Sequence, residues 1–272
     1  MSDRSIEKPR ISVPPQEATV SEDGASKASP RRPRKTPARP AQPKAARKPS
    51  GARNRQAELK QRQAVIATAL EMSRRALSPG RSGNVSCRWP GGMLITPSGM
   101  AYDVLEPADI VFVADDGSVA PNSRKPSSEW QFHLSAYHAR PDRHAIVHTH
   151  STYATVLACA HKRIPAFHYM VAIAGGADIP LVPYATFGTT KLAEHVAAGL
   201  AERDACLMAN HGQIAIGETL ASALELASEV EVLAEQYCKV LTLGKPKLLS
   251  AREMKIVLER FKGYGQHAQK DA

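Results

Sequence analysis

Two histidines, His148 and His150, stand two residues apart at the end of the apolar run "HAIVHTH". If this run is a strand, side chains at positions i and i+2 point to one face, roughly 6.6–6.8 Å apart along the chain. The two imidazoles can then bind one metal ion while Thr149 points away, and imidazole suits Zn²⁺. The alternative is an ordinary pair of polar residues where a strand meets a loop.

A catalytic zinc site takes three protein ligands and keeps a fourth position open. His211 is the candidate third ligand, because it follows the apolar run "ACLMA" and precedes a glycine. Glu129, in "KPSSEW", is the candidate base, because it opens a predicted helix, where the helix dipole favours a carboxylate. A polar loop histidine and an ordinary first-turn glutamate are the alternatives. We assign the other histidines, including His133, to the surface or to packing.

Three loops rich in Gly, Ser, Asn and Thr offer hydroxyl and backbone N–H groups to an anion. They are "RSGNVS", "TPSG" and the "KPSSEW" segment. Ser127 and Ser128 can cap the predicted helix or hold a phosphate at its N-terminus. At this level, an anion site and a set of tight turns are both consistent with the loops.

The elements that must position these residues alternate between strands and helices. Apolar periodicity and turn residues predict strands at 84–89, 92–97, 109–119, 144–150, 166–173, 179–184 and 205–210. They predict helices from Ala57 to about 77 and at 127–141, 151–161, 189–202, 219–243 and 250–265. No Rossmann or P-loop glycine pattern occurs. We therefore expect a single α/β domain with a central sheet covered by helices.

The first 55 residues differ in composition from the rest of the 272-residue chain. They carry 14 of the 36 Lys and Arg residues, only 5 of the 26 Asp and Glu residues, and 9 of the 20 prolines. Without aromatic residues, this segment cannot bury enough apolar surface to offset its chain entropy. We expect a disordered basic tail over 1–55 and a catalytic domain over 56–272. The tail lacks aromatic residues for base stacking, which argues against nucleic acid as a partner.

Composition also bears on the compartment. No apolar stretch reaches the ~18 residues of a membrane helix, and the start "MSDRSIEKPR" has no hydrophobic signal core. The four cysteines, Cys87, Cys159, Cys206 and Cys238, show no CxxC spacing. We expect them to be reduced, mostly buried thiols in a cytoplasmic protein without a membrane partner.

Several of these motifs occur together and in order in one known family. The combination of GNVS, LITPSG, PSSEW, HTH, IPAFHYM, PYATFGT, NHG and SEVEVLAEQY resembles the class II aldolase/adducin family, and within it the aldolases of L-fuculose 1-phosphate. The resemblance covers the body from about residue 57. It implies a three-layer α/β fold with a mainly antiparallel sheet flanked by helices, and a homotetramer with active sites between subunits.

The resemblance also implies a role for individual residues. It makes His148, His150 and His211 the ligands of one Zn²⁺ per subunit. Glu129 matches the acid/base residue, which can also approach the metal. The substrate-phosphate site would comprise Asn84, Ser98, Gly99, Ser127 and Ser128. Tyr169 would reach a neighbouring subunit's site and protonate the aldehyde oxygen, and Phe187 and Tyr264 would line the aldehyde end.

Arg81 departs from the family pattern, which usually has a small hydroxyl residue three positions before the loop asparagine. An arginine can grip the phosphate through its fork of donors, accept a different anion, or point to solvent. We count Arg81 among the expected phosphate-binding residues, and its presence leaves the exact substrate open.

The implied activity is zinc-dependent cleavage of a ketose 1-phosphate to dihydroxyacetone phosphate and an aldehyde. L-Fuculose 1-phosphate and the related deoxy or methylthio pentulose 1-phosphates are the expected substrates. A sugar-phosphate 4-epimerase, dehydratase or decarboxylase on the same scaffold is the alternative. The epimerases carry Asp where this chain has Glu129, which favours the aldolase. An adducin-like interaction protein lacks the metal histidines, which are all present here.

Overall fold

The structure, a computed structural model, describes residues 51–262, with side chains described from residue 54. The expected tail lies outside this range up to residue 50, as does Tyr264. Helix α1 (Gly51–Arg74) begins before Ala57, where the apolar periodicity starts. Its first turns contain residues with good helix propensity but no apolar stripe, and Asn54, Arg55 and Gln56 are exposed. Periodicity therefore placed the start of this helix too late.

One seven-stranded sheet forms the centre of the fold, in the order β3-β2-β1-β4-β7-β6-β5. The strands are β1 (Asn84–Trp89), β2 (Gly92–Ile95), β3 (Val111–Ala114), β4 (Ala145–Thr149), β5 (Leu181–Val182), β6 (Ala205–Met208) and β7 (Gly212–Gly217). Every neighbouring pair is antiparallel except β5 and β6, which are parallel. The expectation of a mainly antiparallel sheet is confirmed. Strand β4 lies at its middle, between β1 and β7.

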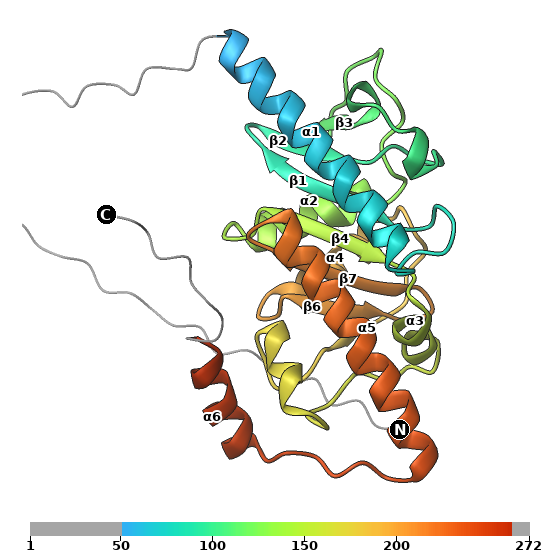
Figure 1. Ribbon diagram of the computed structural model, residues 1–272, viewed down its shortest axis with the longest axis vertical. Helices are drawn as coiled ribbons and strands as arrows, with labels where there is room; N and C mark the ends of the chain where they lie inside the picture. Colours follow the sequence, from blue (N-terminus) through green and yellow to red (C-terminus); the bar gives the residue numbers. More distant parts are fainter. Residues whose placement is uncertain (1–50, 263–272) are drawn as a thin grey trace, which may run out of the picture. The chain divides into compact units, whose positions relative to one another are not determined.

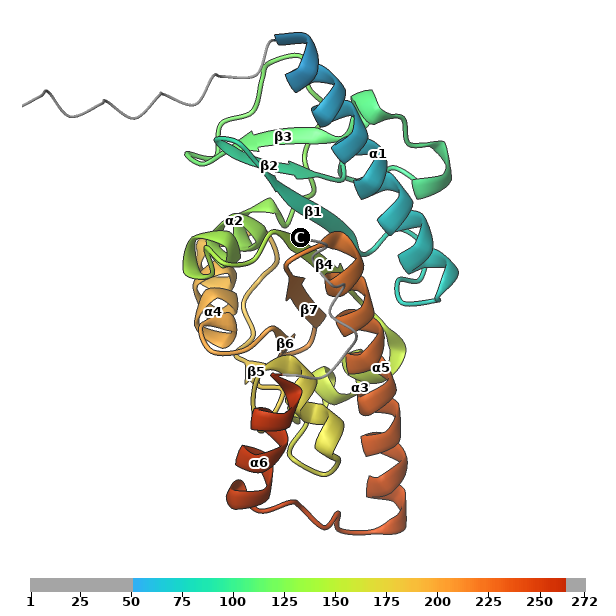
Figure 2. The ribbon, with the colours of Figure 1, turned by 60° about the vertical axis from the view of Figure 1, so that its left-hand side comes forward.

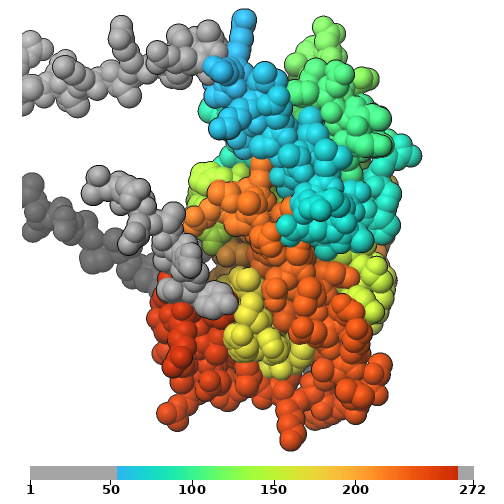
Figure 3. Space-filling view, in the orientation of Figure 1, coloured from blue at the N-terminus to red at the C-terminus, as the bar shows by residue number. Residues whose placement is uncertain are grey.

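Helices cover both faces of this sheet, which gives the expected three layers (Figures 1 and 2). The remaining helices are α2 (Trp130–Ala139), α3 (Thr152–Cys159), α4 (Thr190–Leu200), α5 (Leu220–Leu243) and α6 (Ala251–Phe261). Short 3₁₀ helices lie at η1 (Tyr102–Val104), η2 (Pro107–Asp109) and η3 (Tyr169–Ala174). Helices α1, α3 and α5 pack on one face and α2 and α4 on the other. Figure 3 shows α1 and α5 side by side on the first face.

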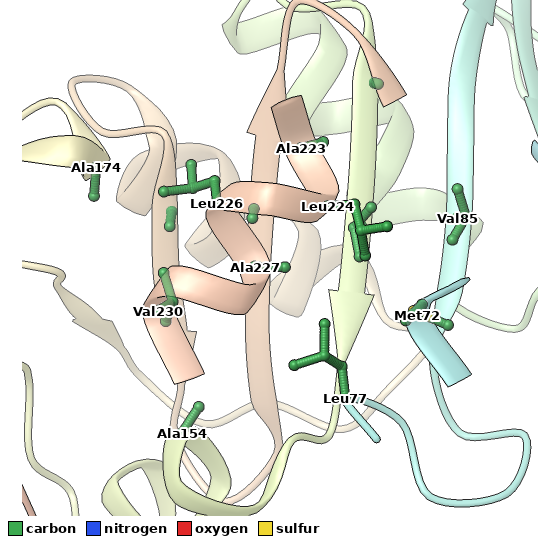
Figure 4. Close-up of a cluster of buried hydrophobic side chains, with 14 of the residues drawn as sticks. Met72, Leu77, Val85, Ala154, Ala174, Ala223, Leu224, Leu226, Ala227 and Val230 are labelled. Atoms are coloured by element: carbon green, nitrogen blue, oxygen red, sulfur yellow. The ribbon is translucent and has the colours of Figure 1, made fainter. Parts of the chain in front are cut away.

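Alternation along each strand supplies two separate cores. In β4, Val147 belongs to the core under α1 and α5, whereas Ile146 belongs to the core under α2 and α4. Figure 4 shows the first core, where Leu224 and Ala227 of α5 face the strands. Each buried aliphatic side chain of this kind contributes about 1.5–3 kcal/mol to folding. The central strands are therefore held on both sides, and the ends of β4, β6 and β7 are fixed supports for side chains.

Local predictions differ from the structure at several points, and strand β7 was not among the predicted strands. The segment 166–173 was expected to be a strand, yet it contains η3, whose first turn is capped by His168: its Nδ1 accepts from the Met170 N–H at 3.2 Å. Its apolar residues Val171, Ala172 and Ala174 are buried in this helical turn, so burial rather than pairing accounts for them. The cysteines were expected to be mostly buried. Cys87 and Cys206 are buried, Cys238 is partly buried and Cys159 is exposed.

Among the helices of the described residues, none combines the length and the low charge that a membrane crossing requires.

Candidate metal centre and substrate cleft

The end of β4 holds the first two histidines in the arrangement expected of a strand. His148 is fully buried, and its Nδ1 lies 2.7 Å from the backbone oxygen of Gln213 on β7. The carbonyl can only accept, so Nδ1 carries the hydrogen and Nε2 is left with a lone pair. That Nε2 lies 3.1 Å from Nε2 of His150. Both imidazoles thus turn the same kind of nitrogen toward one point.

His211 enters from the tight turn that joins β6 to β7. Asn210 adopts the left-handed conformation with φ 53°, and the His211 N–H donates to the Met208 carbonyl at 3.1 Å. Gly212 follows, where a Cβ atom would lie 2.4 Å from the Thr149 oxygen and 3.0 Å from the His150 ring. Only glycine allows this close approach, so it lets β7 start directly beside the end of β4 and brings His211 against His150.

The three imidazoles form a symmetrical cluster with the Glu129 carboxylate. Each pair of histidine ring centroids is 4.9 Å apart, with interplanar angles of 75–81°. Glu129 Oε1 lies 2.9 Å from His211 Nε2, and Oε2 lies 3.2 Å from His148 Nε2. One possible ligand atom from each of the four residues falls within 4.8 Å of the others. Three nitrogens and a carboxylate at such separations suit a tetrahedral divalent cation.

Electrostatics favour the metal-binding protonation state at two members of the cluster, Glu129 and His150. Burial acts to raise the pKa of Glu129, but the charge and hydrogen bonds of His148 and His211 outweigh it and hold that pKa well below its ordinary value. Burial and the charges of His148 and His211 lower the pKa of His150 to about 3. Glu129 is therefore an anion and His150 a neutral imidazole, which are the metal-binding forms.

The start of α2 aims Glu129 into this cluster. Glu129 is the N-cap residue of α2, with φ −109° and ψ 11°, but its side chain makes no capping hydrogen bond. The Ser127 hydroxyl accepts from the Glu129 N–H at 3.3 Å, which makes a local turn before the helix and not the predicted cap of the helix. The Glu129 carboxylate does not cap the helix and is therefore available to the histidines and to Asn84. It is only 6% exposed, and Asn84 Nδ2 donates to its Oε2 at 2.8 Å.

His133, which we assigned to the surface or to packing, contributes hydrogen bonds behind the cluster. It is fully buried, and its ring lies between Asn84, which contacts Nε2, and Ser86, whose Oγ is 2.7 Å from Nδ1. Burial and the charge of His148 lower the pKa of His133 to about 3. Its spacing of four residues from Glu129 on one helix was the available signal, since such residues lie on the same helix face.

A cleft of about 450 Å³ opens over the cluster. Of the expected site residues it is lined by Arg81, Asn84, Ser98, Gly99, Ser127, Ser128, Glu129, His150, Phe187 and His211. His148 lies behind this lining. Three loops that are far apart in the sequence therefore converge with Glu129, His150 and His211 on one cleft.

Arg81 lies at the rim of the cleft rather than away from it. Its Nη1 donates to the Gly99 carbonyl at 2.7 Å and so links the loop before β1 to the loop after β2. The side chain is exposed at this rim. A positive charge therefore stands beside Ser98 and Gly99 in the lining of the cleft.

Tyr169 was expected to take part in the active site, but it does not line the cleft over the histidine cluster. It lies on η3, is 49% exposed, and lines a separate cavity of about 880 Å³ between η3 and α6. Phe187, by contrast, lies at the mouth of the cleft and is 64% exposed. Tyr169 thus does not reach the histidine cluster of its own chain.

Comparison with known proteins gives a consistent result. Residues 63–238 match the family model described as the class II aldolase and adducin N-terminal domain. The chain is 51% identical over 208 residues, 76% of this chain and 94% of the relative, to the 5-methylthioribulose-1-phosphate/5-deoxyribulose-1-phosphate aldolase of Rhodospirillum rubrum. It is also 51% identical over 210 residues, 77% of this chain and 96% of the relative, to the L-fuculose phosphate aldolase of Haemophilus influenzae. A solved L-fuculose 1-phosphate aldolase superposes with a TM-score of 0.72 at 40% identity, covering 75% of this chain and 96% of that chain.

Proposed function

The chain belongs to the class II aldolase and adducin family, and we propose that it is a metal-dependent aldolase that cleaves a ketose 1-phosphate to dihydroxyacetone phosphate and an aldehyde. One observation carries the proposal: three histidines and a glutamate that could hold a metal ion meet at a cleft that is also lined by three loops with Ser, Gly and Asn residues. We propose that the cluster holds a Lewis acid and the loops hold the substrate phosphate.

The bound cation we propose is one Zn²⁺ per subunit, held by His148, His150 and His211. Three imidazole nitrogens are a common ligand set for catalytic zinc. The hydrogen bond from His148 Nδ1 to the Gln213 carbonyl supports this, because it fixes the tautomer that leaves Nε2 for a metal. When bound, the cation supplies a Lewis acid for the ketose carbonyl oxygen.

Glu129 is the proposed acid/base residue. In the cleavage direction the C3–C4 bond breaks, its electron pair moves toward the carbonyl at C2, and C3 must then gain a proton. Glu129 lines the cleft beside His150 and His211, so its carboxylate is placed to carry a proton to C3, or to remove it in the condensation direction. In the condensation direction the ionised carboxylate accepts the C3 proton, and in the cleavage direction it must first take up a proton from solvent before it can pass one to C3.

The phosphate would lie against the loops that line the same cleft. We assign it to Asn84, Ser98, Gly99, Ser127 and Ser128, with Arg81 at the rim. The guanidinium is anchored on the Gly99 carbonyl, and arginine carries further N–H donors for phosphate oxygens. Holding the phosphate at C1 fixes the distance of C2–C4 from the histidines, and such positioning is itself a large part of catalysis.

Phe187 and Tyr169 would serve the aldehyde end. Phe187 presents an exposed ring at the mouth of the cleft. For Tyr169 we propose a role in a neighbouring subunit of a homotetramer, where its hydroxyl would exchange the proton of the aldehyde oxygen. Its exposure on η3, away from its own cleft, supports that role. Tyr264, the other expected residue at this end, lies outside the described residues.

A panel of ketose 1-phosphates tests the proposal. L-Fuculose 1-phosphate, 5-deoxyribulose 1-phosphate and 5-methylthioribulose 1-phosphate are the substrates suggested by the names of the relatives. We expect release of dihydroxyacetone phosphate from at least one of them, followed with a coupled reductase and by mass spectrometry of the aldehyde. The unphosphorylated ketoses are the matched control and should react far more slowly, since they lack the group that the loops would hold. Formation of a 4-epimer or of a dehydrated sugar without any cleavage product would refute the aldolase proposal.

A further inference from the structure

Behind the cluster, α2 and β1 share a row of polar side chains, of which only Glu129 and Asn84 take part in the proposed reaction. On the helix the row consists of Glu129, His133 and Tyr137, and on the strand it consists of Asn84, Ser86 and Arg88. Four helix residues rise about 6 Å, and two strand residues rise about 6.6–6.8 Å. The spacing of side chains along the helix therefore matches the spacing along the strand, so that each of the helix residues lies beside one of the strand residues.

A continuous chain of hydrogen bonds runs along this row into the metal cluster. Tyr137 Oη lies 2.9 Å from Ser86 Oγ, and Ser86 Oγ lies 2.7 Å from His133 Nδ1. His133 Nε2 contacts Asn84 Oδ1, and Asn84 Nδ2 donates to Glu129 Oε2 at 2.8 Å. All five side chains are at most 6% exposed. Water therefore cannot readily replace any of these partners.

The ionised carboxylate at one end determines the direction of every bond. A carboxylate accepts only, so Asn84 must turn its NH₂ group toward Glu129 and its oxygen toward His133. His133 must then donate from Nε2, which leaves Nδ1 of the neutral ring as an acceptor for the Ser86 hydroxyl. The Ser86 oxygen in turn accepts from Tyr137. A single pattern of donors satisfies all five groups.

We propose that His133 is a positioning residue that locks the carboxamide of Asn84 with its NH₂ group facing the cleft and Glu129. The proposal rests on the function proposed above for Glu129 and Asn84. A carboxamide can rotate by half a turn with little change of shape, and only its hydrogen-bond partners decide which end is presented. A rotated Asn84 would turn its oxygen toward two anions, the Glu129 carboxylate and the substrate phosphate. The Glu129 carboxylate sets the orientation of the carboxamide, and the His133 N–H, with Nδ1 of the same ring held by the Ser86 hydroxyl, stabilises that orientation from the other side.

Two amide substitutions at His133 separate this role from simple packing. Glutamine is long enough to place an amide N–H near the position of Nε2 and keep the bond to Asn84, whereas asparagine is too short. We expect His133→Asn to lower kcat/KM by roughly 10- to 100-fold, the range typical of outer partners at metal sites, and His133→Gln to recover most of it. The same substitution at His138, which is exposed on the same helix, is the control and should leave kcat/KM unchanged.

A double-mutant cycle shows whether His133 acts through Asn84. In an Asn84→Ala background no carboxamide remains to be oriented. Adding His133→Asn to that background should therefore change kcat/KM by no more than about twofold, which is the usual scatter of such comparisons. Equal losses in both backgrounds would overturn the positioning role, because they would indicate a general packing defect.

The tautomer of His133 provides a readout that needs neither turnover nor a variant. Nitrogen-15 NMR of the histidine-labelled wild-type chain, with the His133 signals assigned, should show a neutral ring protonated at Nε2. Protonation at Nδ1 or at both nitrogens would overturn the inference whatever reaction the protein catalyses. Absence of turnover on every ketose phosphate would instead refute the proposed function and leave this readout intact.

Discussion

Replacing His211 with alanine is expected to remove the bound metal and to lower kcat by about 10³-fold or more. His211 supplies one of three inward-facing Nε2 atoms, and its loss leaves two histidines whose spacing alone does not define a tetrahedral site. A Lewis acid on the reacting carbonyl contributes several kcal/mol to transition-state stabilisation, and each 1.36 kcal/mol is a factor of ten in rate. Metal content by mass spectrometry and kcat on the best ketose 1-phosphate measure both effects together.

The matched control is His195→Ala, which removes a histidine whose Nδ1 lies 3.0 Å from the Pro183 carbonyl oxygen and which lies outside the cleft lining. It should retain both metal and turnover. The variant at His211 should also keep its thermal transition near that of the wild type in the presence of chelator, since the side chain lies on a turn. Full activity in the His211→Ala protein would contradict its assignment as a ligand.

Replacing Glu129 with glutamine should leave metal binding largely intact while lowering kcat by roughly 10²–10⁴-fold, the usual contribution of a general acid or base. The three imidazoles remain, whereas the amide cannot carry a proton to or from C3. KM should change much less than kcat, because the phosphate loops are untouched. Steady-state kinetics with parallel metal analysis separates the two effects.

Glu194→Gln provides the control for this substitution. Glu194 is exposed on α4 and pairs only with Lys191 at 3.1 Å among the described ion pairs, so its change should be silent. Loss of metal from the Glu129→Gln protein in proportion to its loss of activity would show that Glu129 serves chiefly as a ligand. Unchanged kcat would remove it from the reaction altogether.

Much of the site was predictable because its residues lie where strong local patterns end. The period of two along β4 put His148 and His150 on one face, and the apolar run of β6 followed by His211 and a glycine indicated that His211 lies where a strand ends. Local patterns could not show that β4 and β7 are neighbours. That adjacency depends on the strand order of the whole sheet and on the lack of a side chain at Gly212.

Other features depend on partners that a sequence does not reveal. His133 has the same helical spacing as many packing residues, and its hydrogen bonds exist only because β1 lies against α2 in step. Tyr169 lies in a segment whose β-branched and aromatic residues favour a strand, yet the His168 cap and the burial of Val171 favour a 3₁₀ turn. In both places tertiary contacts decided between local structures of similar propensity.

The most direct test of the central claim is to titrate zinc into chelator-treated, metal-free wild-type protein while following dihydroxyacetone phosphate release. If the cluster of Glu129, His148, His150 and His211 is a catalytic metal centre, turnover should be absent at the start, rise linearly, and stop rising at one zinc per chain. The same titration of the His211→Ala protein should remain flat. Full turnover in protein shown to be free of metal would contradict the account.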